Sequence, residues 1–130
     1  LEAEIRTGAN NGNEVPFSSK HQFTVDGRYR FAEAWSYTLD GLYVSRAFTD
    51  SANTSAENAS ASIGRLPAYW LWNTAIEREF KLADGSLLTT SAGVSNLFDR
   101  QYYFRGIDTS PWGRQPAPGR TLTLGVNYRF

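Results

Sequence analysis

The arginines and aromatic residues of the segment FRGIDTSPWGRQPAPGR could together bind an anion. Arg105, Arg114 and Arg120 supply three guanidinium groups, and Trp112 lies between the first two. A guanidinium group binds a carboxylate through two parallel hydrogen bonds, and an aromatic ring can stack on a catecholate or another planar chelating group. We therefore predict that Arg105, Trp112 and Arg114 bind a ligand.

Two short motifs beside these residues are predicted to be structural instead. Pro118 and Gly119, in the sequence PGR, would shape the start of the strand that follows, together with Arg120. Asn96 and Asp99, in the sequence NLFD, would tie off the end of the preceding strand.

The remaining chemical signals are weak. His21 is the only histidine and has no evident partner for a metal or base role, so we interpret it as an ordinary residue at a strand end. Glu77 and Glu79 share a strand face by their spacing, which favours a solvated wall beside arginines over an acid–base pair. Asn53 and Asn58 begin the sequences NTS and NAS, which match glycosylation acceptors, but we attribute both matches to the Ser/Ala/Asn-rich composition of this segment. No phosphate-cradling glycine loop, catalytic triad or metal-ligand cluster is evident, so we predict no enzymatic activity and no cofactor.

Composition excludes several classes of protein. The chain has 130 residues, with 13 basic and 13 acidic side chains, so it lacks the positive charge of a nucleic-acid-binding protein. It contains no cysteine, which removes disulfides and thiolate chemistry. The sequence shows no apolar run long enough for a transmembrane helix and no N-terminal signal peptide. It starts within a strand-like segment, LEAEIRTG, so we expect this to be a cut end.

Alternating apolar and polar residues predict an all-β fold. The predicted strands cover residues 21–31, 35–48, 69–80, 87–99 and 121–130. The last segment, TLTLGVNYRF, alternates without a break. Its apolar residues are Leu122, Leu124, Val126, Tyr128 and Phe130, and its polar or small residues are Thr121, Thr123, Gly125, Asn127 and Arg129.

The connections between the strands alternate in length. Residues 32–34 and the Asp84-Gly85 turn are short links, whereas residues 7–20, 49–66 and 104–120 form long polar loops. Alternation of this kind is typical of a transmembrane barrel, which has short periplasmic turns and long extracellular loops. Aromatic residues near both kinds of link would form two interfacial girdles. Those near the short links or the terminus are Phe31, Trp35, Phe80, Tyr128 and Phe130, and those near the long loops are Tyr43, Phe48, Tyr69, Trp70, Tyr102 and Tyr103.

The apolar faces leave alternatives open. In a secreted soluble β-sandwich they would pack on a second sheet, and exposed Trp and Tyr side chains would bind glycans. In a barrel they would face lipid, and charged residues would line a wet interior. These residues are Asp26, Arg28, Arg30, Asp40, Glu77 and Arg129. Five full strands and a partial sixth are too few for a natural barrel, so the chain would be part of a larger one, either a transporter or a purely structural outer-membrane barrel.

Several motifs resemble one known family. GVSNLFDRQYY and the final PGRTLTLGVNYRF resemble the C-terminus of TonB-dependent outer-membrane receptors. GNEVPFSSKHQFTVDGRYRF, LYVSRAFTDSANTS and GRLPAYWLWNTAIEREF are similar to late-barrel segments of the siderophore and ferric-citrate-like branch. The resemblance implies that residues 1–130 form the last five to six strands of an antiparallel, up-and-down, 22-stranded transmembrane β-barrel. It also implies that Leu1 closes an upward strand and that Phe130 lies at the periplasmic rim.

The same resemblance implies a function and partners. The intact receptor would lie in the outer membrane of a Gram-negative cell, in contact with lipid, and would import an iron chelate, either a ferric siderophore or ferric citrate. TonB would bind an N-terminal region that is not in this chain, so the fragment alone would not transport. The barrel-assembly machinery would read the final strand, with Leu122, Leu124, Val126, Tyr128 and Phe130 as assembly and closure residues.

Overall fold

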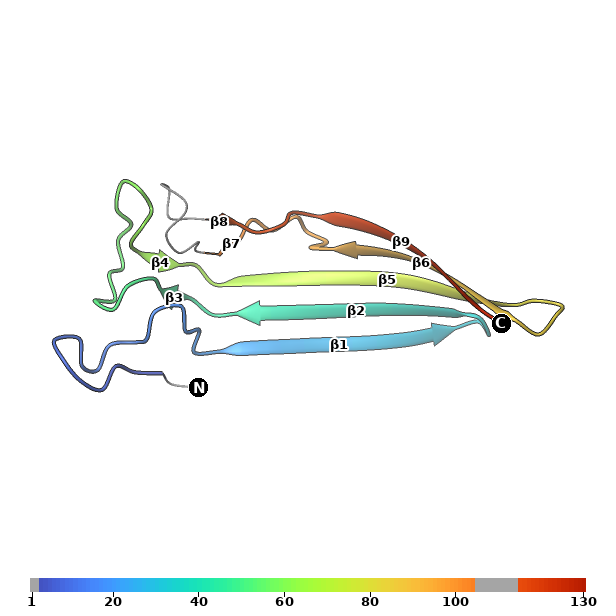
Figure 1. Cartoon of the computed structure of the whole chain (residues 1–130), viewed down its shortest axis with the longest axis horizontal. Helices are drawn as coiled ribbons and strands as arrows, with labels where there is room; N and C mark the ends of the chain where they lie inside the picture. The colour runs from blue at the N-terminus through green and yellow to red at the C-terminus, as the bar shows by residue number, and fades with distance from the viewer. Residues whose placement is uncertain (1–2, 105–114) are drawn as a thin grey trace. The chain divides into compact units, whose positions relative to one another are not determined.

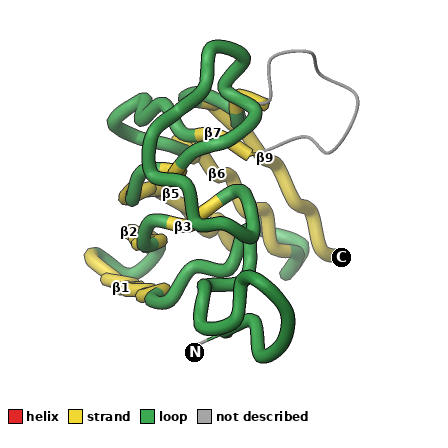
Figure 2. Tube along the Cα trace, turned by 90° about the vertical axis from the view of Figure 1, so that its left-hand side faces the viewer, coloured by secondary structure: helices red, strands yellow, loops and turns green. Residues whose placement is uncertain are grey.

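The computed structural model describes residues 3–104 and 115–130, which form strands, turns and loops without a helix (Figure 2). No helix able to cross a membrane is therefore found within these two ranges. Five long strands form one sheet in the order β1-β2-β5-β6-β9 (Figure 1). Their bounds are β1 Gln22–Phe31, β2 Trp35–Val44, β5 Tyr69–Lys81, β6 Leu87–Ser95 and β9 Thr121–Arg129. The all-β prediction is confirmed, and β6 pairs antiparallel with both β5 and β9.

Two short ladders lie within or beside the predicted loops. β3 (Ala47–Phe48) pairs with β4 (Arg65–Leu66), and β7 (Tyr103–Phe104) pairs with β8 (Gln115–Pro116). The strand predicted over residues 35–48 is therefore interrupted after Val44, because Ala47 and Phe48 pair with β4.

The predicted partial sixth strand is the segment LEAEIRTG at residues 1–8. Its described residues form only one isolated bridge, between Glu4 and Glu14. An extended segment becomes a strand only where a neighbour accepts its hydrogen bonds, and here the chain pairs with itself across a tight loop. Ile5 N donates to Asn13 O at 2.8 Å, and Gly12 N donates to Ile5 O at 2.8 Å. Leu1 lies outside the described residues.

The chain divides into two compact units. Unit 1 comprises Leu1–Phe23, Tyr43–Trp70 and Gln101–Ala117. Unit 2 comprises Thr24–Leu42, Leu71–Arg100 and Pro118–Phe130. The boundaries cross β1, β2 and β5, so these strands contribute residues to both units, whereas β6 and β9 belong entirely to unit 2.

The register in unit 2 fixes which side chains share a face. Directly opposed residues of an antiparallel pair point to the same side of the sheet. One such row crosses β5, β6 and β9 at Ile76, Ala92 and Leu124. The next row begins with Glu77 and Ser91 and points to the other side. The predicted division of these three strands into an apolar and a polar face is confirmed.

A short turn joins β5 to β6, as the Asp84-Gly85 sequence predicts. Gly85 has φ +85°, a left-handed conformation that glycine adopts without strain, and its N–H donates to Leu82 O at 3.0 Å. The Asp84 carboxylate accepts hydrogen bonds from the Ser86 hydroxyl and from Ser86 N. These bonds hold the pKa of Asp84 below its ordinary value.

The apolar face has no covering layer in the described residues. Leu124 and Val126 are 74% and 75% exposed, and Ala47 is the only buried apolar side chain in these ranges. The described residues contain only one sheet of more than two strands, so they do not supply the second sheet that a β-sandwich requires. An exposed apolar face on this scale needs a non-aqueous neighbour.

Candidate functional site

The NLFD and PGR motifs form one hydrogen-bonded junction in unit 2. Asn96 is 5% exposed, and its amide donates to Arg100 O at 2.9 Å and to Pro118 O at 3.3 Å. Its side-chain oxygen accepts from Arg100 N at 2.7 Å. The Asp99 carboxylate accepts from Arg120 N at 2.9 Å. The structural role predicted for these motifs is confirmed, because they join the end of β6 to the start of β9.

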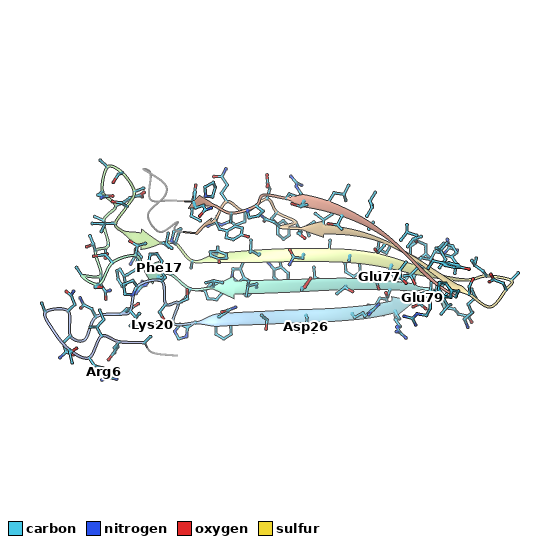
Figure 3. The ribbon with its side chains drawn as sticks, in the orientation of Figure 1. Arg6, Phe17, Lys20, Asp26, Glu77 and Glu79 are labelled. Atoms are coloured by element: carbon cyan, nitrogen blue, oxygen red, sulfur yellow. The ribbon has the colours of Figure 1, made fainter. Side chains whose placement is uncertain are left out.

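The polar face of unit 2 carries a three-strand network. Arg28 of β1 donates to Ser36 of β2 at 3.0 Å and forms an ion pair with Glu77 of β5. Ser36 also donates to Glu77 at 3.2 Å. Figure 3 shows Asp26 on β1 and Glu77 and Glu79 on β5. The Glu77 carboxylate is therefore paired with the Arg28 guanidinium. This pairing agrees with a charged wall and gives no support to an acid–base pair of Glu77 and Glu79.

An aromatic cluster in unit 2 includes an arginine that alternation alone did not reveal. The Phe31 and Trp35 rings stack with centroids 6.1 Å apart. The Arg78 guanidinium carbon lies 5.0 Å from the Trp35 ring centroid and 4.4 Å from that of Phe80. Arg78 shares the apolar face, where stacking on rings offsets the cost of placing a cation among apolar groups. The sequence does carry a signal for this contact, because Arg78 is a cation at the alternate position between Ile76 and Phe80.

A second aromatic row lies in unit 1. His21 stacks on Phe23 with centroids 6.4 Å apart, Phe23 on Tyr43 at 5.9 Å, and Tyr43 contacts Trp70 at 5.1 Å. By the alternation along their strands, Phe23, Tyr43 and Trp70 belong to the apolar sets, and His21 lies just before β1. Within each unit the structure thus gathers aromatic side chains on the apolar set, whereas their arrangement as two girdles at different depths stays a prediction.

Basic side chains from three separate segments of unit 1 line an open hollow of about 530 Å³, which we name the basic hollow. Its lining includes Lys20 before β1, Arg46 after β2, and Arg65 in β4, with Glu14, His21 and Tyr43. Lys20 forms an ion pair with Glu14 at 3.0 Å. Arg46 and Arg65 are exposed and form no ion pair with any described residue. This site was missed in the sequence because its three basic residues span 45 positions, from Lys20 to Arg65.

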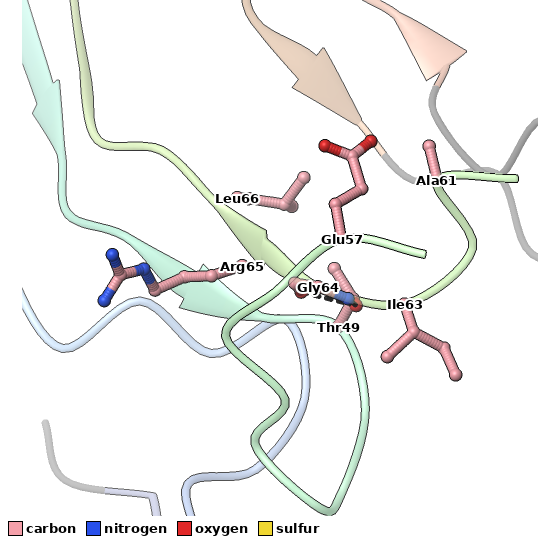
Figure 4. Close-up of a pocket in the computed structure, with 7 residues that line it drawn as sticks. All are labelled: Thr49, Glu57, Ala61, Ile63, Gly64, Arg65 and Leu66. Atoms are coloured by element: carbon pink, nitrogen blue, oxygen red, sulfur yellow. Dashed lines mark hydrogen bonds between the residues drawn. The ribbon is translucent and has the colours of Figure 1, made fainter. Parts of the chain in front are cut away.

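Hydrogen bonds within the loop between β3 and β4 position Arg65. Thr49 donates its hydroxyl to Gly64 O at 2.6 Å and accepts from Gly64 N at 2.9 Å (Figure 4). Figure 4 also shows that the Arg65 side chain extends away from Glu57 and Ile63. The loop is thus closed at its base, and Arg65 is presented on a paired strand.

The asparagines of the glycosylation-like sequences are used structurally. Asn53 accepts from Glu14 N at 2.7 Å and donates to Glu14 O at 2.9 Å, which joins two loops. Asn58 accepts from Ser62 N at 2.8 Å and donates to the Ser62 hydroxyl. These bonds agree with the interpretation that the two matches arise from composition.

The predicted ligand residues Arg105, Trp112 and Arg114 lie outside the described residues. Tyr102, three positions before Arg105 in the sequence, contacts the Tyr69 ring with centroids 4.8 Å apart. In the described ranges no group of three or more His, Cys, Asp or Glu side chains is arranged to hold a metal ion. The ligand role of the final loop stays a prediction.

A two-faced antiparallel sheet whose apolar side is uncovered in the described residues agrees with the wall of a barrel, and comparison with known proteins identifies the family. Residues 2–97 match the family model described as TonB dependent receptor-like, beta-barrel. This match covers more than half of the 130 residues. The chain belongs to the TonB-dependent receptor β-barrel family. The all-β barrel fold and the family predicted from the sequence are confirmed, whereas the count of 22 strands in the whole barrel stays a prediction.

Individual relatives agree with this assignment. The chain is 30% identical to the metal-pseudopaline receptor CntO of Pseudomonas aeruginosa, in an alignment that covers 98% of the chain and 17% of that receptor. It superposes on the unliganded ferric citrate transporter FecA with a TM-score of 0.86 and 35% identity, over 97% of the chain and 19% of FecA. BauA, the ferric preacinetobactin receptor of Acinetobacter baumannii, shares the fold with a TM-score of 0.76 and 17% identity, over 96% of the chain and 18% of BauA. The chain spans less than a fifth of the length of each relative.

Proposed function

We propose that this chain is part of the barrel wall of a Gram-negative outer-membrane receptor that imports an anionic metal chelate. The observation that carries the proposal is the register across β5, β6 and β9, which sorts apolar and polar side chains onto opposite faces. Lipid would cover the apolar face, and the polar face, with the Arg28–Glu77 pair, would line the interior. The whole receptor would be required for transport, with TonB as its energising partner.

The substrate class we propose is an iron chelate, either a ferric siderophore or ferric citrate. FecA is named for ferric citrate and CntO for metal-pseudopaline, so both named ligands are metal chelates. In the final loop, Arg105, Arg114 and Arg120 give a positive balance that suits an anionic chelate. Trp112 would stack on a planar part of the ligand.

The test is binding of the ferric chelate to the intact receptor carrying Arg105→Ala or Arg114→Ala. A buried charge-assisted hydrogen bond contributes about 1.5–3 kcal/mol, so each change should weaken binding by about ten- to a hundredfold. Arg100→Ala is the matched control, because Arg100 is exposed and only its backbone takes part in the Asn96 junction. Unchanged affinity in both variants at low and moderate salt would exclude this loop as the ligand site.

We also propose that β9 is an assembly and closure strand. β9 lies at one end of the strand order, so its outer edge has no partner among the described strands. Unpaired N–H and C=O groups cannot face lipid, and another strand of the intact receptor would pair with them. Leu122, Leu124, Val126, Tyr128 and Phe130 would then form a lipid-facing row that the barrel-assembly machinery recognises.

A further inference from the structure

The basic hollow of unit 1 carries positive charge that the proposed chelate site does not use. Lys20 Nζ lies 3.0 Å from Glu14 Oε1, so the charges of these two residues neutralise each other. Arg46 and Arg65 line the hollow and form no ion pair with a carboxylate of the described residues. Both arginines are exposed, so their guanidinium groups remain available to a ligand. Two uncompensated guanidinium groups around one hollow favour an anion with several oxygen atoms.

The hollow adjoins the aromatic row of the apolar set. His21 and Tyr43 line it, and both belong to the row His21–Phe23–Tyr43–Trp70. Both residues are thus shared between the row and the hollow. Aromatic rings with one polar edge gather at the level of lipid headgroups in membrane proteins. A cationic hollow beside such a row lies where headgroup phosphates are expected.

We propose that the basic hollow binds a phosphate group of a lipid headgroup in the outer leaflet of the membrane. Arg46 and Arg65 bind the phosphate oxygens, and the row of rings packs against the upper part of the acyl region. The proposal rests on the membrane placement put forward under the proposed function, but it does not depend on the identity of the imported chelate.

The side of the sheet favours a lipid over the imported chelate. A substrate passing through the barrel would meet the polar face, whereas Tyr43 and Phe23, on which His21 stacks, belong to the predicted apolar sets of their strands. A lipid also satisfies both parts of the surface, because its phosphate pairs with the arginines and its chains cover the rings.

The hollow is held in shape by hydrogen bonds from each contributing segment. His21 N donates to the Ser45 hydroxyl at 3.1 Å, and Ser45 N donates to His21 O at 2.9 Å. These bonds fix the backbone at Ser45, directly before Arg46. The Thr49–Gly64 pair closes the loop that leads to Arg65. Since these segments are ordered before a ligand arrives, binding costs less conformational entropy.

The experiment is native mass spectrometry of the detergent-purified intact receptor, titrated with bisphosphorylated lipid A, the same lipid without its phosphates, and inorganic phosphate. The Arg46→Gln/Arg65→Gln variant should lose at least tenfold in affinity for the phosphorylated lipid and bind both lipids alike. Arg6→Gln is the control, because Arg6 is exposed, lies 3.7 Å from Glu4 and does not line the hollow. Each single variant, and Arg65→Lys, which keeps the charge, should show an intermediate loss.

Chelate affinity measured on the same samples separates the two proposals. If the double variant keeps its chelate affinity and loses the lipid, the hollow is a headgroup site whatever the result for Arg105 and Arg114. If the phosphorylated lipid binds the double variant as tightly as the unchanged receptor, the proposal is wrong. It is equally wrong if inorganic phosphate binds as tightly as the lipid, or if the double variant loses only the chelate.

Discussion

Replacing Asn96, which directly follows β6, should destabilise the receptor more than replacing an exposed polar residue of β6 or β9. The hydrogen bonds of Asn96 indicate the size of the effect. The side chain makes two short hydrogen bonds with the backbone of Arg100, at 2.9 and 2.7 Å, and a longer one with Pro118 O at 3.3 Å. At 5% exposure, water cannot readily replace these partners. A typical hydrogen bond within a protein contributes about 0.5–1.5 kcal/mol net, so loss of the two short bonds in Asn96→Gly should cost about 1–3 kcal/mol.

Alanine should be worse than glycine at this position. Asn96 has φ +50°, in the left-handed region that asparagine and glycine tolerate and that costs other residues about 1–2 kcal/mol. Asn96→Ala adds this strain to the lost bonds, so it should lower the free energy of unfolding by about 2–5 kcal/mol.

The assay is urea unfolding of the intact receptor in lipid vesicles, followed by tryptophan fluorescence. Asn127→Ala is the control, because Asn127 is an exposed residue of the polar set of β9, and it should change the free energy of unfolding by less than about 0.5 kcal/mol. If Asn96→Gly and Asn96→Ala both behave like this control, the junction does not hold β6 to β9 and our reasoning about it fails.

Three further outcomes are expected. Gly41→Val should destabilise the receptor by about 1–3 kcal/mol through overpacking, because a Cβ at Gly41 would lie 2.7 Å from the Trp72 ring. Gly27→Val is the control, since a Cβ at Gly27 would have no atom within 4 Å, and equal unfolding midpoints for the two variants would contradict the prediction. Phe130→Ser should lower the amount of receptor in the outer membrane more than it lowers chelate affinity, and a normal surface abundance measured by immunoblotting would argue against closure through β9. Residues 1–130 produced alone should give detergent-held assemblies without pores, because β1 and β9 lie at the two ends of the strand order and their outer edges have no partner among the described strands. A water-soluble monomer with sharp thermal unfolding, seen by light scattering and calorimetry, would favour a β-sandwich instead.

Alternation predicted much of the fold because side-chain direction has a period of two in any strand. The division of TLTLGVNYRF into two faces follows from that period alone, and the pairing of Leu124 with Ala92 and of Val126 with Thr90 agrees with it. The Asp84-Gly85 turn was equally predictable, because few sequences adopt that backbone so readily.

The parts that sequence reasoning missed depend on contacts between distant segments. β3 and β4 are two residues each, too short for a periodic signal, and they exist only because Ala47 meets Leu66. Arg46, Arg65 and Lys20 converge on one hollow through that pairing and through the Ser45–His21 bonds. Nothing in the local sequence of any of these residues encodes the convergence.

Arg78 was missed for a different reason. It interrupts the apolar set of β5, so a count of alternating residues passes over it, whereas the rings of Trp35 and Phe80 explain its place. The partner Trp35 belongs to another strand, and only the sheet order brings the two together.

The central claim is that the apolar face of β9 meets lipid and its polar face meets water inside the receptor. The most direct test is single cysteine substitution at positions 123 and 124 of the intact receptor in vesicles, with a fluorescent label at each site. A label at position 124 should be quenched by a lipid-soluble quencher and protected from a water-soluble one, and a label at position 123 should show the reverse, because adjacent strand residues face opposite sides. A label at position 123 that reports lipid, with water at position 124, would contradict the account.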